Sequence, residues 1–265
     1  MYLDPQERTY VIGDPHGMRL EFDEMIQRIE DDLGKYPALK ARLVIAGDLI
    51  DRGYDSAGIV QTIVHLPNRW PSVEIIVIRG NHDTALIESV AGNLDIYRRW
   101  ILPSTGGKET LRSYGVDPNI SAEKAPEVLR NTIPTEHLDM FGNMLLSLDD
   151  GKRIFVHAGI RPGVRIDKQV EHDMLFIRGE FLYYRGPLDR FVIHGHSPRR
   201  NPEIRPYRLN VDTGAGYGLK LTCAILSGPT LKNIRFFSVP ITHAPCIWRD
   251  APVRHTIKHP KETAA

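Results

Sequence analysis

The sequence has few cysteines, no long apolar run and almost no net charge. Cys223 and Cys246 are the only cysteines, too few for a disulfide framework or a zinc ribbon, so we expect the reducing cytoplasm as the location. No apolar stretch approaches the ~18 residues that a membrane span needs, and the start of the chain lacks the apolar segment of a secretory signal. A formal net charge of +1 points to neither nucleic acid nor a membrane as a partner.

The remaining composition is that of an ordinary folded protein, in which β-rich runs and helical patterns alternate. The 265 residues are 42% hydrophobic, enough for a sizeable core. Five runs predict strands that close at a glycine or a turn, over residues 8–13, 42–47, 73–80, 153–159 and 191–197. Apolar spacing predicts helices over 19–36, 55–66 and 84–94. This alternation predicts an α/β fold with parallel strands.

The later part of the chain has a different pattern. Residues 208–218 and 220–228 are typical of an antiparallel hairpin, and 232–240 predicts one more strand. The segment from about 95 to 150 is rich in helical patterns, and we expect it to form an insertion over one face of the sheet. The last residues, 241–265, are weakly periodic, so we expect a poorly ordered C-terminal tail.

Polar side chains follow each of the five strand candidates. In chain order they are Asp14, His16, Asp48, Asn81, His82, His157 and His196. Ligands of open α/β sheets bind outside the carboxyl ends of the strands, so we expect these side chains to converge. Each one alone is more simply explained as a turn residue or a buried hydrogen-bonded group. Their recurrence at five strand ends favours a common site instead.

The types of side chain indicate a pair of metal ions. Without His82, the side chains are two carboxylates, one amide oxygen and three imidazoles. This mixture suits manganese, iron or zinc better than calcium or copper(I). Six ligands are too many for one zinc and about right for two ions that share a bridging carboxylate, for which Asp48 is the best candidate. Asp14 and His16, two residues apart in extended backbone, would point to the same side and hold one ion together.

The charge of such a site favours a phosphate ester as the substrate. Two divalent ions carry more positive charge than two carboxylates neutralise, and Arg52 and Arg178 add guanidinium groups that match phosphate oxygens. The ions would lower the pKa of a bridging water, and the metal-bound hydroxide would attack phosphorus. His82 is the candidate that protonates the leaving group, and Asp51 is the candidate that fixes the tautomer of His82.

These residues also form motifs that resemble a known family. "GDPHG", "GDLIDRG", "RGNHD", "HAG" and "HGHS" occur in this order between residues 10 and 197. They resemble the signature of calcineurin-like metallophosphoesterases, most closely the phosphoprotein phosphatase branch. The resemblance assigns the first metal to Asp14, His16 and Asp48, and the second metal to Asp48, Asn81, His157 and His196. It assigns phosphate contacts to Arg52, Arg178 and His82, with Asp51 supporting His82.

The resemblance further implies the fold and the cofactor. The fold would be a central β-sandwich of mixed sheets flanked by helices, an α-β-β-α arrangement, in one catalytic domain over residues 1–240. The cofactor would be two divalent metal ions, with Mn²⁺ as the first choice and iron or zinc as alternatives. Asp83 stands where eukaryotic protein phosphatases of this family carry glutamate, and "WILPSTGGKETLRSYG" resembles segments of bacterial phosphatases and diadenosine-tetraphosphatase-like members.

Two substrate classes fit these features. Our first choice is a phosphorylated protein, dephosphorylated at serine or threonine and, with dual specificity, at tyrosine; the alternative is a dinucleoside polyphosphate such as diadenosine tetraphosphate. A pyrophosphate substrate would favour further cations, for which Lys108, Arg112 and Arg161 are candidates. A third hypothesis, a binding protein with a degenerate site, is disfavoured because every expected ligand is present. Asp212, in a lone "DTG", lacks the second carboxylate of an aspartic protease and fits a strand end that lines the metal cleft.

Overall fold

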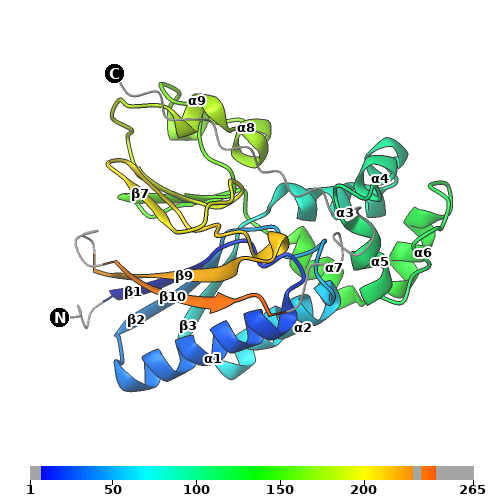
Figure 1. Ribbon diagram of the computed structural model, residues 1–265, viewed down its shortest axis with the longest axis horizontal. Helices are drawn as coiled ribbons and strands as arrows, with labels where there is room; N and C mark the ends of the chain where they lie inside the picture. The colour runs from blue at the N-terminus through cyan, green and yellow to red at the C-terminus, as the bar shows by residue number, and fades with distance from the viewer. Residues whose placement is uncertain (1–6, 229–233, 243–265) are drawn as a thin grey trace.

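Two sheets packed face to face, with helices on both outer sides, make up the computed structural model (Figure 1). The structure describes residues 7–228 and 234–242, so the expected tail lies almost entirely outside the described residues. The first sheet has the strand order β10-β9-β1-β2-β3, and the second has the order β4-β5-β6-β8-β7. Both sheets mix parallel and antiparallel pairs, which confirms the expected α/β sandwich.

The elements alternate between strands and helices in the first part of the chain, as the sequence predicts. The strands are β1 (Glu7–Ile12), β2 (Lys40–Ile45), β3 (Val73–Val77), β4 (Ser147–Asp149), β5 (Arg153–Val156), β6 (Phe191–His194), β7 (Glu203–Arg205), β8 (Arg208–Asn210), β9 (Lys220–Ser227) and β10 (Arg235–Pro240). The helices are α1 (Arg19–Lys35), α2 (Ser56–Arg69), α3 (Asn81–Ala91), α4 (Leu94–Trp100), α5 (Gly107–Ser113), α6 (Ala125–Thr132), α7 (Thr135–Gly142), α8 (Glu171–Phe176) and α9 (Gly179–Leu182), with short 3₁₀ turns η1 (Ile166–Lys168) and η2 (Ala215–Tyr217).

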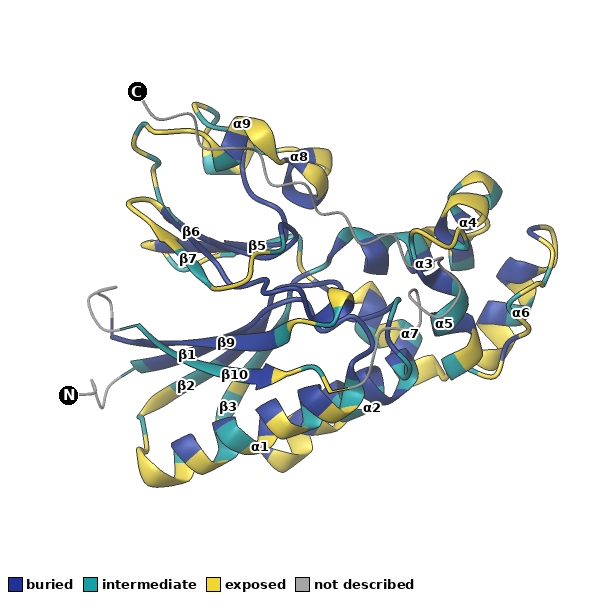
Figure 2. Cartoon of the chain, in the orientation of Figure 1, coloured by how far each residue is buried: buried dark blue, intermediate teal, exposed yellow. Residues whose placement is uncertain are grey.

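Alternate residues of each central strand fill two separate cores. On β1, Tyr10 and Ile12 pack with the residues of α1 and α2, whereas Val11 points to the other face and packs between the sheets. A third apolar cluster lies between the second sheet and the segment that holds α8 and α9, with Phe181 fully buried in it. Burial on both faces of a strand accounts for its continuous apolar sequence, and Figure 2 shows dark, buried residues along central strands such as β1 and β9.

Parallel pairing brings the carboxyl ends of the important strands to one place. β1 pairs parallel with β2, and β2 with β3, as the alternation of strands and helices predicts. In the second sheet, β5, β6 and β8 are parallel neighbours. The segments that follow these six strands therefore start at the carboxyl edges of the two sheets; the loops carry five of the six proposed metal ligands, and the sixth, Asn81, begins the helix after β3.

The helix α3 begins at Asn81, three residues before the start that apolar spacing predicts. The Asp83 side chain accepts a hydrogen bond from the N–H of Gly80, the N-cap residue, at 2.9 Å and so stabilises the N-terminus of the helix. Because of this cap, Asn81 and His82 lie in the first helical turn, and the His82 N–H donates to Asp48 Oδ1 at 3.0 Å. The start of α3 therefore faces the site directly.

The expected hairpin between 208–218 and 220–228 is wrong. β8 belongs to the second sheet, where it pairs with β6 and β7, and β9 belongs to the first sheet, where it pairs with β1 and β10. The intervening segment crosses between the sheets through η2, flanked by Gly214 and Gly218 with φ of 78° and 75°. A glycine-rich connection between two β-rich runs is locally the same for a hairpin and for a crossing, and only contacts distant in sequence distinguish them. The strand expected at 232–240 does pair with β9.

The segment between β3 and β4 contains α3 to α7 and extends the helical layer of the first sheet. α6 and α7 pack against α3, and α7 also packs against α2. Trp100, Leu111, Leu129 and Phe141 from this segment join the core that α1 and α2 form with the first sheet. This packing places α5 and the end of α4 beside the loop after β2.

Candidate metal centre and catalytic residues

The loops after the strands adopt an unusual backbone conformation. Among the described residues, the non-glycine residues with positive φ are His16, Asp48, Asp51, Arg52 and His196, with φ between 45° and 76°. All of them are site candidates from the sequence. Such a conformation costs about 1–3 kcal/mol per residue and persists where the surroundings impose it, most often at functional sites. It also corrects the expectation that Asp14 and His16 share a side of extended backbone, because His16 has φ 45°.

The backbone of Asp48 is held by a buried carboxylate that the sequence analysis did not assign. Asp83 accepts hydrogen bonds from the Asp48 N–H at 2.8 Å and the Leu49 N–H at 3.0 Å, besides the Gly80 N–H. Burial, together with the nearby Asp48 carboxylate, raises the pKa of Asp83 to about 7. The position next to His82 in "RGNHD" was the available sequence signal for this role.

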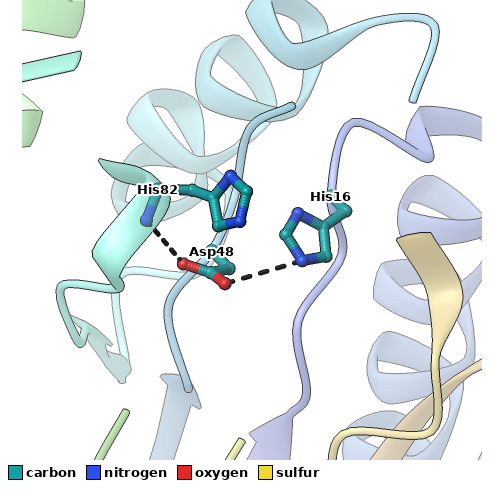
Figure 3. A group of neighbouring side chains, drawn as sticks. All are labelled: His16, Asp48 and His82. Carbon is teal, nitrogen blue, oxygen red and sulfur yellow. Dashed lines mark hydrogen bonds and ion pairs between the residues drawn. The ribbon is translucent and has the colours of Figure 1, made fainter. Parts of the chain in front are cut away.

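Two groups of side chains that could hold a metal ion share the carboxylate of Asp48. One consists of His16, Asp48 and His82, and the other of Asp48, His157 and His196; within each group the ligand atoms lie within 4.8 Å of one another. Figure 3 shows His16 and the N–H of His82 on either side of the Asp48 carboxylate, with Asp48 Oδ2 3.5 Å from His16 Nε2. Asp48 is therefore common to both groups.

Two of the imidazoles are oriented by backbone carbonyl groups, as metal-binding histidines usually are. His16 donates from Nδ1 to the Ile50 carbonyl oxygen, and His157 donates from Nδ1 to the Ala46 carbonyl oxygen, each at 2.9 Å. These bonds fix the tautomer that leaves the Nε2 lone pair free. In both residues Nε2 faces the Asp48 carboxylate, at 3.5 and 3.4 Å.

The surroundings of His157 attract a positive charge. Its Nε2 lies 3.0 Å from Asn81 Oδ1 and 3.2 Å from His196 Nδ1, so several polar atoms converge at this nitrogen. Burial alone would lower the pKa of His157, but the carboxylates of Asp48 and Asp14 and the hydrogen bond to Ala46 together outweigh it and raise that pKa to about 10. For His196, burial and the neighbouring His157 lower the pKa to about 2. This electrostatic environment would favour a divalent cation between these side chains.

Asp14 lies beside these groups but belongs to neither of them. Its Oδ2 accepts the His196 N–H at 2.8 Å, while Oδ1 is buried and has no hydrogen-bond partner among the described residues. His196 Nε2 is buried and unpartnered in the same way. Burial, and then the Asp212 carboxylate, raise the pKa of Asp14 well above its usual range. Two buried polar atoms without a hydrogen-bond partner on expected ligands fit a cation site, because such an atom is costly to bury.

His82 and Asp51 form the expected pair. The two side chains are 2.6 Å apart between His82 Nδ1 and Asp51 Oδ2, and Asp51 is completely buried. The Asp51 carboxylate also accepts from Trp100 Nε1 at 2.9 Å and from the Thr110 hydroxyl at 2.6 Å. Trp100 and Thr110 were not expected here, since they lie about 50 residues away in the helical segment and no local pattern marks them.

Arg52 points into the site between two imidazoles. Its Nη1 donates to His16 Nε2 at 2.8 Å and its Nη2 donates to His82 Nε2 at 2.9 Å. The guanidinium also stacks on the ring of Tyr217, 4.7 Å from its centroid. Because His16 Nε2 is one of the expected ligand atoms, Arg52 and a metal ion compete for the same lone pair, and burial together with Arg52 holds the pKa of His16 well below its usual range.

The remaining expected cations differ in their surroundings. Arg178 caps α9 and is exposed, and its side chain has no hydrogen bond or ion pair with another described residue, although its charge contributes to the low pKa of His196. Lys108 donates to Asn119, Arg112 to Glu109, and Arg161 to Asp173 and Glu180. Of these candidates, Arg178 is therefore the one that is available to an anion.

The chain belongs to the calcineurin-like phosphoesterase family, whose model matches residues 7–221. It is 28% identical over 255 residues to bis(5'-nucleosyl)-tetraphosphatase PrpE, asymmetrical, of Anoxybacillus flavithermus, which covers 88% of this chain and 94% of the relative. The protein of the same name in Oceanobacillus iheyensis is 27% identical over 233 residues, covering 80% of this chain and 86% of that relative. The family resemblance of the motifs is thereby confirmed.

Solved structures share the fold. A protein described as a candidate diadenosine tetraphosphatase has a TM-score of 0.59 at 22% identity, covering 90% of this chain and 98% of that chain. A protein serine/threonine phosphatase from Saccharomyces cerevisiae has a TM-score of 0.54 at 13% identity, covering 91% of this chain and 82% of that chain. A mutant cold-active protein tyrosine phosphatase has a TM-score of 0.56 at 12% identity, covering 91% and 83%. At these identities the likeness concerns the fold alone.

These comparisons settle the class of chemistry. The chain is a phosphoric ester hydrolase of a family that depends on a dinuclear metal centre, and it has two groups of His and Asp side chains that could hold a metal ion. Among the described residues, no helix is long and apolar enough to cross a membrane.

Proposed function

We propose that this chain uses two divalent metal ions to hydrolyse dinucleoside polyphosphates, and that Asp48 bridges the ions. The observation that carries the proposal is the sharing of Asp48 between two groups of potential ligands. Asp14 and His16 would complete the first site with Asp48. Asn81, His157 and His196 would complete the second site, with Nε2 of His157 and His196 as ligand atoms. Mixed oxygen and nitrogen ligands suit manganese, which is our first choice, as well as iron and zinc.

The residues of the chain have distinct parts in the proposed reaction. When bound, the two ions lower the pKa of water and neutralise the negative charge that develops at phosphorus. Arg52 and Arg178 bind the oxygens of the phosphate, for which a guanidinium is well matched. Asp51 stabilises His82 as an imidazolium, and the Nε2–H of His82 gives its proton to the oxygen that leaves phosphorus.

The substrate class rests on relatives of nearly full length. Two relatives named bis(5'-nucleosyl)-tetraphosphatase are covered over 94% and 86% of their lengths. Water would add across one phosphoanhydride bond, and asymmetrical cleavage of diadenosine tetraphosphate would yield AMP and ATP. The second candidate substrate is a protein phosphorylated at serine, threonine or tyrosine, which is the first choice from the sequence alone. It would use the same residues, and the chain shares its fold with phosphatases of both kinds.

The proposal includes the setting of the enzyme. A single catalytic domain over residues 1–240 is supported by the family match to residues 7–221. The cytoplasm as location is supported by the presence of only two cysteines in the sequence. Nucleic acid is not proposed as a partner, since the net charge is +1.

One panel tests the function. Protein loaded with Mn²⁺ is assayed on diadenosine tetraphosphate, phosphopeptides and p-nitrophenyl phosphate, with and without a chelator. We expect turnover of the dinucleotide to AMP and ATP, lost with the chelator. Asp48→Asn should lower turnover by several orders of magnitude while the fold survives, and Asp95→Asn, an exposed surface residue, serves as the matched control. Turnover of phosphopeptides but not of the dinucleotide would select the second candidate, and full activity of Asp48→Asn would refute the shared metal ligand.

A further inference from the structure

A pocket on the second sheet holds aromatic and cationic side chains that the proposed mechanism does not use. Its walls are α9 with the residues that follow it, and the hairpin of β7 and β8 together with Arg199. We call it the tyrosine–arginine pocket, defined by Tyr183, Tyr184, Arg185, Arg199, Tyr207 and Arg208, and its volume is about 190 Å³. Figure 1 shows α9 on the outer side of the second sheet.

Both walls continue from segments that carry proposed site residues. α9 has Arg178 as its N-cap and Tyr183 as its C-cap, so about 8 Å of helix separates the phosphate arginine from the pocket. Arg199 follows the proposed ligand His196 by three residues, and its N–H donates to the Asp212 carbonyl oxygen at 3.1 Å. Both walls of the pocket are therefore continuous in sequence with segments that carry proposed site residues.

The charges in the pocket favour an anion. Four arginines line it, against a single carboxylate, Glu203. Glu203 already accepts from Arg205 at 2.7 Å and from Arg208 at 2.6 Å. Arg185 and Arg199 have no carboxylate partner among the described residues. Guanidinium groups without a partner beside a pocket are suited to phosphate oxygens.

The aromatic residues favour a flat ring as the other part of the ligand. Tyr183 is 73% exposed, and Tyr184 and Tyr207 are 41% and 37% exposed. None of the three hydroxyl groups has a hydrogen-bond partner among the described residues, so these rings are not engaged elsewhere in the fold. Exposed tyrosine faces next to arginines are a typical platform for a nucleobase and its phosphate.

A buried arginine holds the two walls together. Arg208 is only 6% exposed. It donates to the Leu182 carbonyl oxygen at the end of α9 and to Glu203 on β7. Its Nη1 also donates to His194 Nε2 at 3.3 Å, and His194 Nδ1 donates to the Gly195 carbonyl oxygen. The pocket is thus built around a fixed side chain that also contacts the strand leading to His196.

From these observations we propose that the tyrosine–arginine pocket binds a nucleoside phosphate, namely the part of a dinucleoside polyphosphate that extends away from the metal centre. The base stacks on the tyrosine rings, and Arg185 and Arg199 bind the adjoining phosphate oxygens. This inference rests on the proposed function for its substrate, but the pocket also binds free nucleotide. Under this proposal, the pocket is the reason why the enzyme prefers nucleotides to simple phosphate esters.

The test compares substrates in a double variant, Tyr183→Ala with Arg199→Ala. Its matched control is Tyr36→Ala with Arg165→Ala, which removes an exposed tyrosine and an exposed arginine outside the pocket. We expect the ratio of kcat/KM for diadenosine tetraphosphate to that for p-nitrophenyl phosphate to fall about tenfold or more in the pocket variant, with an unchanged ratio in the control. Tyr183→Phe, which keeps the ring, should retain the ratio. An unchanged ratio in the pocket variant would overturn the proposal.

A binding measurement separates failure of the pocket from failure of the proposed function. Calorimetric titration of the manganese-loaded protein with ADP and with inorganic phosphate gives two dissociation constants. We expect the pocket variant to weaken ADP about tenfold more than phosphate, even if the wild-type enzyme does not cleave the dinucleotide. Equal changes for both ligands would overturn the pocket. A variant that selectively loses phosphopeptide turnover would identify a peptide site and would likewise overturn it.

Discussion

The hydroxyl of Thr110 provides a sharp test of how the site is assembled, because Thr110→Val removes it with little change of shape. Thr110 is 1% exposed, and its hydroxyl donates to Asp51 Oδ1 at 2.6 Å while accepting the Asp51 N–H at 2.9 Å. After the substitution the N–H keeps the Ser56 hydroxyl at 3.1 Å. The change therefore removes the hydrogen bond to the buried carboxylate, together with the 3.1 Å contact between the hydroxyls of Thr110 and Ser56.

The size of the effect follows from that one bond. A hydrogen bond to a charged group contributes about 1.5–3 kcal/mol to stability. For a domain of this size, 1 kcal/mol lowers the melting temperature by roughly 2–4 °C, so we expect a drop of about 5 °C. Because Asp51 holds His82, turnover should fall more for a substrate with a poor leaving group than for p-nitrophenyl phosphate.

The assay combines thermal unfolding with kinetics on two substrates. Thr62→Val is the matched control, since Thr62 also donates to a carboxylate, Asp23, at 2.9 Å but on the surface of α2. We expect the control to keep the wild-type dependence on the leaving group. If Thr110→Val were as stable and as active as the wild type on both substrates, the hydrogen bonds around Asp51 would have no part in holding His82.

Three further outcomes follow from the same structure. His82→Asn should slow the hydrolysis of an alkyl phosphate such as a phosphoserine peptide more than that of p-nitrophenyl phosphate, because an alkoxide needs protonation to leave and nitrophenolate needs little; equal losses in a kinetic comparison would exclude His82 as the acid. Burial lowers the pKa of His137, so the stability that the neutral side chain contributes above pH about 6.5 is lost as the pH falls. Chemical denaturation at pH 7 and pH 5 should therefore show that the free energy of unfolding falls less for His137→Gln than for the wild type. Burial raises the pKa of the Cys223 thiol, so iodoacetamide followed by peptide mass spectrometry should find Cys223 modified in the denatured chain but not in the native one.

The sequence predicts the elements that carry the site because these depend on local patterns. β-rich runs that close at a glycine define β1, β2 and β6 to within two or three residues, and parallel order follows from the helices between them. The polar residues directly after those strands then meet at the carboxyl edges of the sheets. For this reason the pairing of His82 with Asp51 and the central place of Asp48 are both predictable.

The parts that depend on contacts distant in sequence are not predictable in this way. β8 and β9 look like one hairpin, yet each finds its partner in a different sheet, because burial against other strands decides the pairing. Trp100 and Thr110 reach Asp51 only through the packing of α4 and α5, and no spacing in the chain marks them. The hydrogen bond from the backbone of Asp48, which has φ 50°, to Asp83 likewise depends on a residue 35 positions away, at the start of α3.

The most direct test of the metal centre is anomalous X-ray diffraction from crystals of the protein loaded with Mn²⁺. We predict two anomalous peaks with the Asp48 carboxylate between them. One peak would lie beside Asp14 and His16, and the other beside Asn81, His157 and His196. A single peak, or peaks that do not touch Asp48, would contradict a dinuclear centre bridged by that carboxylate.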